Sequence, residues 1–399
     1  SRKTSLMRRI LPYLFSAMLT MGLYGSVYGQ ITSGETGGQV NVINTAVPFL
    51  RITPDARSGA MGDAGIALSP DPNSVYWDLA KIPFAQNDGG LSMTYTPWLT
   101  DIVNDVFLAY LSGYKQLDAN QAIGASLRYI DYGNIQFTDI NGQDQGIFHP
   151  REFSFDAGYA RKLSDNFSMG IALRYIYSNL AAGTNISGVT FKPGQAVAGD
   201  VSAFYTNSID YNNGQSGTWN FGLTVTNVGT KIAYSNSAQF KNFLPTNLGI
   251  GGSYTQQFDE YNKITFDLDA NKLLVPTPDT GQLDANGNPA YLDQSVVNGI
   301  FHSFTDAPGG FKEEMQEINF ALGMEYWYND LFAIRAGYFN ENKYKGDRKF
   351  FTLGLGLKYS AFGINFSYLI PSGSGVQRNP LSNTLQFSLI VNFGQSNQN

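Results

Sequence analysis

Cysteine is absent from the 399-residue chain, and histidine occurs only twice, as His149 and His302. Without cysteine there can be no disulfide framework, thiolate metal site, cysteine nucleophile or lipid-modified cysteine. Neither histidine has a partner at metal-ligand spacing, so a zinc site is not expected. No Gly-x-Ser-x-Gly elbow is present either. The sequence therefore predicts a protein that is not an enzyme and that holds no metal or cofactor.

Charged residues are also scarce, at 15% of the chain, with a net charge of −6. Nucleic-acid binding relies on clustered lysine and arginine, so a nucleic-acid partner is not expected. Glycine and aromatic residues are abundant instead, with 43 Gly, 24 Tyr and 28 Phe. This composition is typical of a large all-β membrane barrel and not of a soluble α/β enzyme.

Long apolar runs are confined to the beginning of the chain. Basic residues between positions 2 and 9 precede an apolar segment from about Ile10 to Leu23, and small residues follow up to Gly29. This pattern predicts a secretory signal peptide, residues 1–29. No later segment is apolar for about twenty residues, which excludes a membrane-spanning helix. We therefore expect export across the inner membrane, with only strands available to insert into the outer membrane.

Apolar and polar residues alternate along many short runs. The clearest lie near the C-terminus, where large side chains occupy one parity and mostly Gly, Ser, Thr and Asn the other. A period of two indicates strands with one apolar and one polar face. A soluble sandwich would turn the large residues inward, and a membrane barrel would turn them toward lipid. The four clearest runs are 332–339, 351–359, 362–368 and 385–393.

About fourteen such runs follow Gly89, and the connections between them are alternately short and long. A soluble closed sheet of this size would enclose a space too wide for apolar side chains to fill. The pattern predicts an all-β, antiparallel up-and-down transmembrane barrel over residues 89–394, with a periplasmic tail at 395–399. Short turns would be periplasmic, long loops extracellular and both termini periplasmic. The segment Asn207–Gly217 fits least well, because it is long for a periplasmic turn.

Residues 30–88 do not alternate and are predicted to form an N-terminal plug inside the barrel. The small residues of Ser58–Gly65 allow close approach to another backbone. Asp71 and Pro72 predict a helix that starts there and runs to about Leu79. The candidate plug residues are Arg57, Met61, Asp63, Trp77 and Asp78.

The strand register also places charged side chains in the lumen. Their mixed signs suggest pairing with one another or with the plug, and not a selectivity ring of one sign. Scattered hydrated charges are the alternative. The residues are Arg128, Asp156, Arg174, Asp200, Asp267, Asp269, Glu325, Arg335 and Lys358.

The longest loop, Lys272–Gln316, contains several large apolar residues among Pro, Gly and Asp. Loops of this length are usually functional or disordered. Aromatic residues without a local core suggest contact with another protein, or else a lid over the barrel mouth. The candidate partner-binding residues of the predicted external loops are Trp98, Phe148, His149, Phe191, Phe240, Phe243, Leu274, Tyr291, Phe301, Phe304, Phe311 and Tyr344.

Two stretches resemble a known family. Residues 49–65 (FLRITPDARSGAMGDAG) and 74–80 (SVYWDLA) are similar to the N-terminal signature of the PorV family and, more distantly, to the plug signature of FadL-type barrels. Residues 332–339 (FAIRAGYF) and 345–354 (KGDRKFFTLG) resemble the PorV C-terminal hairpin. The FadL-type plug usually reads Asn-Pro-Ala-Gly where this chain has Asp-Leu-Ala-Lys at 78–81, which puts a conduit for hydrophobic substrates in doubt.

The resemblance implies a component of the type IX secretion system of Bacteroidetes. Such a barrel would take cargo from the SprA (Sov) translocon by recognising its C-terminal signal domain. It would then present the cargo to the PorU sortase, which attaches it to surface glycolipid. Outer-membrane lipid and lipopolysaccharide would surround the barrel. The alternatives are a FadL-like transporter of small hydrophobic molecules, which needs a continuous apolar path, and a diffusion porin, which needs an open pore.

Overall fold

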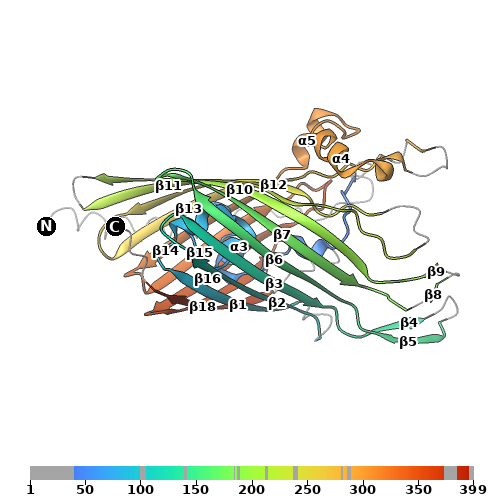
Figure 1. Cartoon of the computed structure of the whole chain (residues 1–399), viewed down its shortest axis with the longest axis horizontal. Coiled ribbons are helices and arrows are strands. Elements are labelled where there is room, and N and C mark those ends of the chain that lie inside the picture. Colours follow the sequence, from blue (N-terminus) through green and yellow to red (C-terminus); the bar gives the residue numbers. More distant parts are fainter. Residues whose placement is uncertain are drawn as a thin grey trace.

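The computed structural model of the chain is a closed barrel of fourteen antiparallel strands around an N-terminal segment (Figure 1). The predicted signal peptide and the tail at 395–399 lie outside the described residues. No helix in the described part of the chain is long and apolar enough to cross a membrane. The described residues are 40–98, 105–138, 142–183, 185–186, 189–211, 214–236, 241–279, 282–284, 289–372 and 384–394.

Consecutive barrel strands pair with each other, and β1 pairs with β18 to close the sheet. This confirms the predicted fold. The barrel strands are β1 (Gly89–Pro97), β2 (Phe107–Gln116), β3 (Gln121–Asp131), β6 (Arg151–Lys162), β7 (Phe167–Asn179), β10 (Gly194–Tyr211), β11 (Gln215–Gly229), β12 (Asn247–Gln257), β13 (Asn262–Leu273), β14 (Asn319–Tyr328), β15 (Phe332–Asn340), β16 (Lys349–Tyr359), β17 (Phe362–Pro371) and β18 (Leu385–Phe393). Two small hairpins in the loops, which the alternation did not predict, are β4 (Ile135–Thr138) with β5 (Asp144–Phe148) and β8 (Asn185–Ile186) with β9 (Val189–Thr190).

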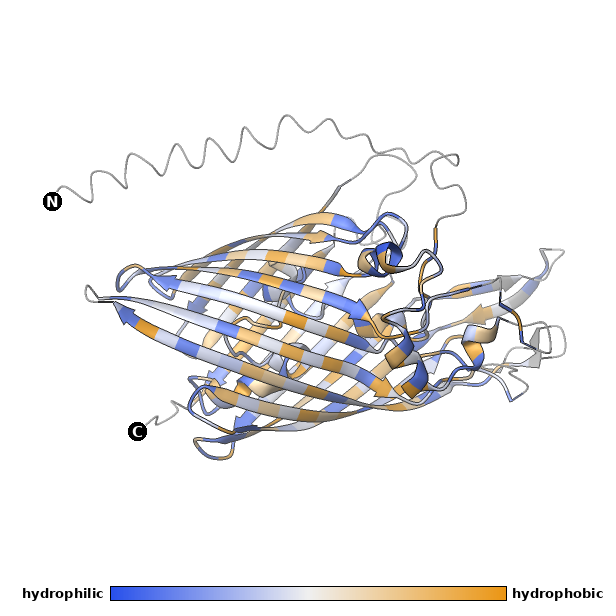
Figure 2. Ribbon diagram, turned by 90° about the horizontal axis from the view of Figure 1, so that it is seen from above, coloured by the Kyte–Doolittle hydropathy of each residue, from blue (hydrophilic) through white to orange (hydrophobic). Residues whose placement is uncertain are grey.

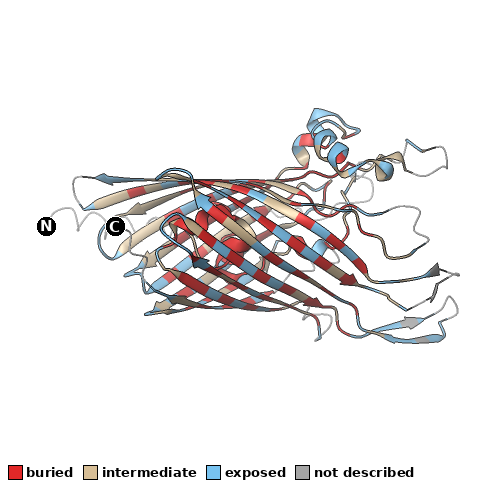
Figure 3. Ribbon diagram, viewed as in Figure 1, coloured by how far each residue is buried: buried red, intermediate tan, exposed pale blue. Residues whose placement is uncertain are grey.

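The large apolar side chains point away from the lumen. On β16, Leu353, Leu355 and Leu357 are about half exposed, while Phe350 and Thr352, which have the opposite parity, are buried. Exposed and buried residues alternate along many of the barrel strands in Figure 3, and apolar and polar residues alternate in Figure 2. An apolar outer wall around a polar interior is the arrangement of a barrel in lipid.

The N-terminal segment fills the lumen with short helices. They are η1 (Pro48–Arg51), α2 (Ala56–Ala60), α3 (Ser74–Trp77) and η2 (Leu79–Phe84). Helix α2 packs against β16 and β17, and η2 packs against β6 and β7. A Cβ atom at Gly337 of β15 would lie 2.0 Å from the backbone nitrogen of Gly62. Glycine is therefore needed at these two positions, because the plug backbone and the wall backbone are in contact there.

The predicted helix start at Asp71 is wrong. Helix α3 begins at Ser74, with Asn73 at its N-cap. The Asp71 carboxylate instead accepts a hydrogen bond from the backbone N–H of Asn73, and the Asp71 carbonyl accepts one from Ser74. The aspartate thus forms a turn before the helix.

The barrel has two unlike ends. Short connections join the strands at the turn end, where β1 begins and β18 ends, and long connections form the loop end. The segment Asn207–Gly217 was predicted to be a long turn, but β10 reaches Tyr211 and β11 starts at Gln215, so the turn is short. Backbone pairing continues there although the residues have become polar.

At the loop end, the connection from β13 to β14 folds into three short helices where the sequence predicted only a loop. We call residues 289–316 the helical lobe. It contains η3 (Ala290–Asp293), α4 (Val296–His302) and α5 (Phe311–Gln316). The lobe projects from the barrel rim (Figure 1).

Candidate functional site

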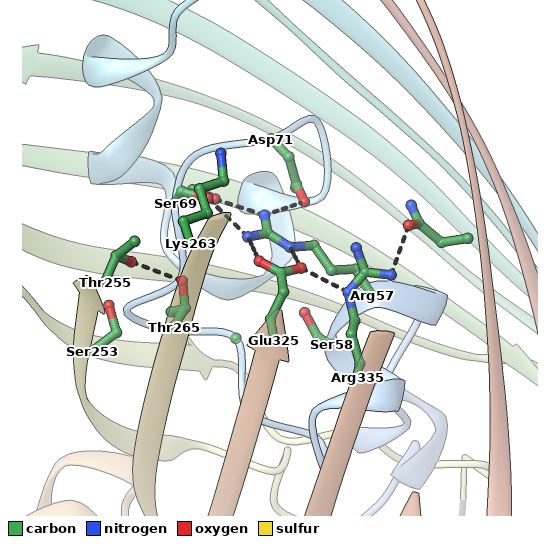
Figure 4. A network of polar contacts seen from close by, with 12 residues as sticks. Arg57, Ser58, Ser69, Asp71, Ser253, Thr255, Lys263, Thr265, Glu325 and Arg335 are labelled. Atoms are coloured by element: carbon green, nitrogen blue, oxygen red, sulfur yellow. Dashed lines mark hydrogen bonds and ion pairs between the residues drawn. The ribbon is translucent and has the colours of Figure 1, made fainter. Parts of the chain in front are cut away.

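A buried ion network ties the plug to the wall. Arg57 of α2 donates hydrogen bonds from Nε and Nη2 to the two carboxylate oxygens of Glu325 on β14, at 3.1 and 2.9 Å. Arg335 of β15 donates to the same carboxylate at 2.6 Å and to Asn365 at 2.9 Å. Arg57 also binds Asp71 at 3.1 Å (Figure 4). Charge-assisted bonds in a buried site are strong, so this network fixes the plug in place.

A second network lies on the opposite wall. Arg174 of β7 forms ion pairs with Asp156 of β6 and with Asp200 of β10, the latter at 3.0 Å. Arg174 also donates to Asn227 of β11. These contacts join four neighbouring strands across the lumen side of the sheet.

Backbone groups of the plug are bound directly by wall side chains. Asp269 of β13 accepts hydrogen bonds from the N–H groups of Gly65 and Ile66, at 2.7 and 2.9 Å. Arg128 of β3 donates to the carbonyl of Phe49 at 3.0 Å. Gly65 and Ile66 lie outside helices and strands, and Phe49 lies in the single turn of η1, so the wall supplies partners for backbone groups that these short segments do not pair themselves.

The remaining predicted lumen and plug residues lie in the same region. Asp267 is buried, and Lys358 is half-buried at the turn end. Met61 packs against Gly323 of β14, and Trp77 donates to Asp55 at 2.7 Å. Asp78 caps η2 by accepting from Ala80 at 2.8 Å, and Asp63 lines a cavity on the loop side.

Cavities lie on both sides of the plug. The one at the turn end has a volume of about 430 Å³ and is lined by Arg57, Lys263, Trp327 and Lys358, among others. On the loop side, cavities of about 90 and 230 Å³ share Arg51 and Arg348. Their linings are rich in charged and amide side chains. Among the described residues, no group of His, Asp and Glu side chains is placed to hold a metal ion.

A charged cluster holds the base of the helical lobe. Lys272 of β13 pairs with Glu314 and Glu317, the former at 3.0 Å, and Lys345 pairs with Glu313 and Glu317 at 2.6 and 2.9 Å. We call these five residues the lobe clamp. The lobe clamp was not predicted from the sequence, although Glu313 on α5 and Glu317 at its C-cap are four residues apart and could have indicated a basic partner. The clamp gives the lobe a fixed position on the rim.

The upper surface of the lobe exposes apolar side chains. Phe301 and Phe311 are 72% and 79% exposed, and Val297, Phe304 and Met315 are also exposed. Val297 and Phe301 are about one helical turn apart on α4, as are Phe311 and Met315 on α5, so each pair lies on one face of its helix; Phe304 follows the end of α4. A fixed surface with protruding aromatic rings is suited to binding another protein.

Two of the predicted partner-binding residues are buried. Phe243 and Leu274 are 5% and 4% exposed, so neither is available for docking, and that prediction is wrong for both. Phe243 lies beneath α4, close to Gly299, because the lobe folds over it.

The other predicted partner-binding residues are dispersed over the loop end. His149 is exposed, and its Nε2 lies 2.7 Å from a carboxylate oxygen of Asp131. Phe240 lies outside the described residues. The residues that are partly buried are Trp98, Phe148, Phe191, Tyr291 and Tyr344.

The lobe clamp makes the lobe sensitive to acid. Partial burial disfavours the charged form of Glu313, but hydrogen bonds from Lys345 and from the backbone of Gly309 outweigh it and lower the pKa of Glu313. A lowered carboxyl pKa stabilises the folded form above the ordinary pKa, and this contribution is lost as the pH falls through the lowered value. We therefore expect the protection of α5 against hydrogen exchange, corrected for the intrinsic effect of pH on the exchange rate, to fall below about pH 4.5. In Glu313→Gln this corrected protection should not change as the pH falls; a retained fall would contradict the role of Glu313.

The geometry as a whole defines a plugged outer-membrane β-barrel. Residues 35–280 match the family model described as "Type IX secretion system protein PorV". The match covers more than half of the chain, and the chain belongs to the PorV family. It is accordingly an outer-membrane component of the type IX secretion system.

Three solved structures that are similar to this chain have low sequence identity to it. The Ralstonia pickettii toluene transporter TbuX has a TM-score of 0.46 and 12% identity, with 85% of this chain and 98% of that chain covered. The P. putida toluene transporter TodX has a TM-score of 0.47 and 12% identity, with 86% and 99% covered. A Pseudomonas aeruginosa FadL homologue has a TM-score of 0.41 and 10% identity, with 88% and 99% covered. No curated protein matches the chain in sequence.

Proposed function

We propose that this chain is the shuttle of the type IX secretion system. It binds the C-terminal signal domain of cargo that leaves the SprA (Sov) translocon and presents that cargo to the PorU sortase. In this proposal the loop end is extracellular and the turn end, where β18 finishes, is periplasmic, as in other up-and-down outer-membrane barrels. Membership in the PorV family supports this role. The main support for a docking site on the helical lobe is that its aromatic residues are exposed.

The filled lumen supports docking over conduction. The plug is tied to the wall through Glu325 and Asp269, which leaves separate cavities at the two ends. A transporter of hydrophobic molecules needs a continuous apolar path, whereas these cavities are lined largely by charged and amide groups. Uptake of a hydrophobic dye by liposomes that carry the protein would favour the transporter instead.

The fixed base of the lobe supports strong binding. Ordering a mobile loop on binding costs free energy, and a preorganised surface avoids that cost. The lobe clamp holds α5 through Glu313 and Glu317, while the rings of Phe301 and Phe311 project into solvent. Aromatic anchors of this kind contribute most of the binding energy at protein interfaces.

The double variant Phe301→Ser/Phe311→Ser is expected to bind an isolated cargo signal domain at least about 30-fold more weakly, since one aromatic anchor contributes about 2 kcal/mol. Surface plasmon resonance with the barrel in nanodiscs measures this effect. The matched control is Ile147→Ser in β5, a residue that is 72% exposed and outside the lobe. Undiminished binding by the double variant would reject the lobe as the docking site.

A further inference from the structure

The β10–β11 hairpin extends beyond its neighbour at the turn end. The pairing of β10 with β7 ends at Tyr205 opposite Phe167, while the pairing of β10 with β11 continues to Tyr211 opposite Gln215. Among the described residues, a strand therefore pairs with Asn207–Tyr211 on one side only. The hairpin projects past the other strands in Figure 1.

The backbone contacts of Thr206 show which groups face the free side. The Thr206 N–H donates to the carbonyl of Asn166 at 2.9 Å, and the Asn166 side chain donates to the Thr206 carbonyl at 2.7 Å. Backbone groups of alternate residues point to the same side of a strand. The N–H and C=O groups of Ser208 and Asp210 therefore point away from β11. Both residues are exposed, and no strand in the described part of the chain pairs with them on this side.

We propose that this edge binds an extended segment of a partner polypeptide as an additional β-strand. Two donors and two acceptors, repeated at the two-residue spacing of a strand, are complementary to another extended backbone. Exposed edges are usually protected by lysine, proline or a bulge. The segment Asn207–Tyr211 contains neither lysine nor proline.

The side chains define the chemistry of the partner segment. Ser208 and Asp210 share the parity of the buried Phe204, and Ile209 and Tyr211 lie on the apolar outer side, where they are 43% and 41% exposed. The partner strand therefore carries polar residues on one face and apolar residues on the other, with lysine or arginine opposite Asp210. A second copy in the same membrane would present its β10 in parallel, and parallel pairing is less stable per residue. The edge lies at the end opposite the lobe and does not depend on the proposed cargo binding.

The test compares two substitutions of one residue. Ser208→Pro removes the N–H that faces the free edge but leaves the bonds between β10 and β11, which use the odd-numbered residues; Ser208→Ala keeps this N–H. The probe is a fluorescent nonapeptide of alternating threonine and valine with one lysine, added to the barrel in nanodiscs. We expect saturable binding by anisotropy, weakened about tenfold by Ser208→Pro and within about twofold for Ser208→Ala.

Charge and assembly provide further checks. Asp210→Asn should weaken binding of the lysine peptide but not of a peptide with threonine in its place. Both Ser208 variants should show the same heat-modifiable gel mobility as the parent, which confirms that they fold. Absence of saturable binding, or equal binding by the two Ser208 variants, would overturn the proposal. A doubled particle mass without peptide binding would assign the edge to a second copy and overturn it as well.

Discussion

The substitution Glu325→Gln is expected to lower the free energy of unfolding of the barrel by about 3 to 5 kcal/mol, because it leaves two buried cations without their shared anion. Glu325 is 2% exposed and receives hydrogen bonds from Arg57 of the plug and from Arg335 of the wall. A neutral amide can accept only part of these bonds and cannot offset the buried charge. Urea unfolding, followed by tryptophan fluorescence and by gel mobility, measures the loss.

An exposed ion pair provides the control. Lys263 and Asp330 pair at the turn end, where the Asp330 side chain is 62% exposed. Asp330→Asn should cost no more than about 1 kcal/mol, because water screens such pairs. If both variants lost the same free energy of unfolding, burial of the Glu325 network would not explain its contribution to stability.

The substitution Gly337→Ala is expected to displace the plug. Its Cβ atom would lie 2.0 Å from the nitrogen of Gly62 and 2.1 Å from the carbonyl carbon of Met61. These are backbone atoms, so the clash cannot be relieved by rotating a side chain. Overpacking of this kind costs about 1 to 3 kcal/mol or more. We expect ion conductance in planar bilayers for this variant and none for the parent protein, together with a lowered unfolding midpoint of the variant.

The matched control is Gly363→Ala in β17. A Cβ atom there would have its nearest neighbour at 3.6 Å, an ordinary contact distance. This variant should conduct no more than the parent protein. Conductance from both variants, or from neither, would contradict the proposed role of the contact between Gly337 and Gly62.

The barrel could be predicted from the sequence because lipid on one side and the lumen on the other impose a period of two. Leu353 and Leu355 are exposed to the outside and Thr352 is buried, as the alternation of these residues indicates. The end of β10 could not be predicted in this way. Ser208–Tyr211 extends past the last residue that pairs with β7, and its composition is typical of a turn. The segment stays extended because it pairs with β11, and this pairing cannot be inferred from composition.

The parity of the strands predicts that Glu325 and Arg335 point into the lumen, but it does not predict that Arg57 binds Glu325. Arg57 lies 268 residues from Glu325 in the chain, and only the folded plug brings them together. The burial of Phe243 could not be predicted from the sequence either, because it depends on α4 covering this loop residue. Contacts between distant segments are the part of the candidate site that the sequence pattern does not contain.

The pairing of β1 with β18 has a consequence for biogenesis. Tyr95 lies opposite Phe387, so the cylinder is sealed by strands from the two extremes of its sequence. The barrel cannot close until β18 is available to pair with β1. Because the two strands are far apart in the sequence, bringing them together has a large entropic cost. The plug precedes β1, and its helices, from Pro48 to Phe84, lie inside the barrel, so we expect the wall to form around the plug. A chain truncated before β18 would present two open margins to any insertion machinery.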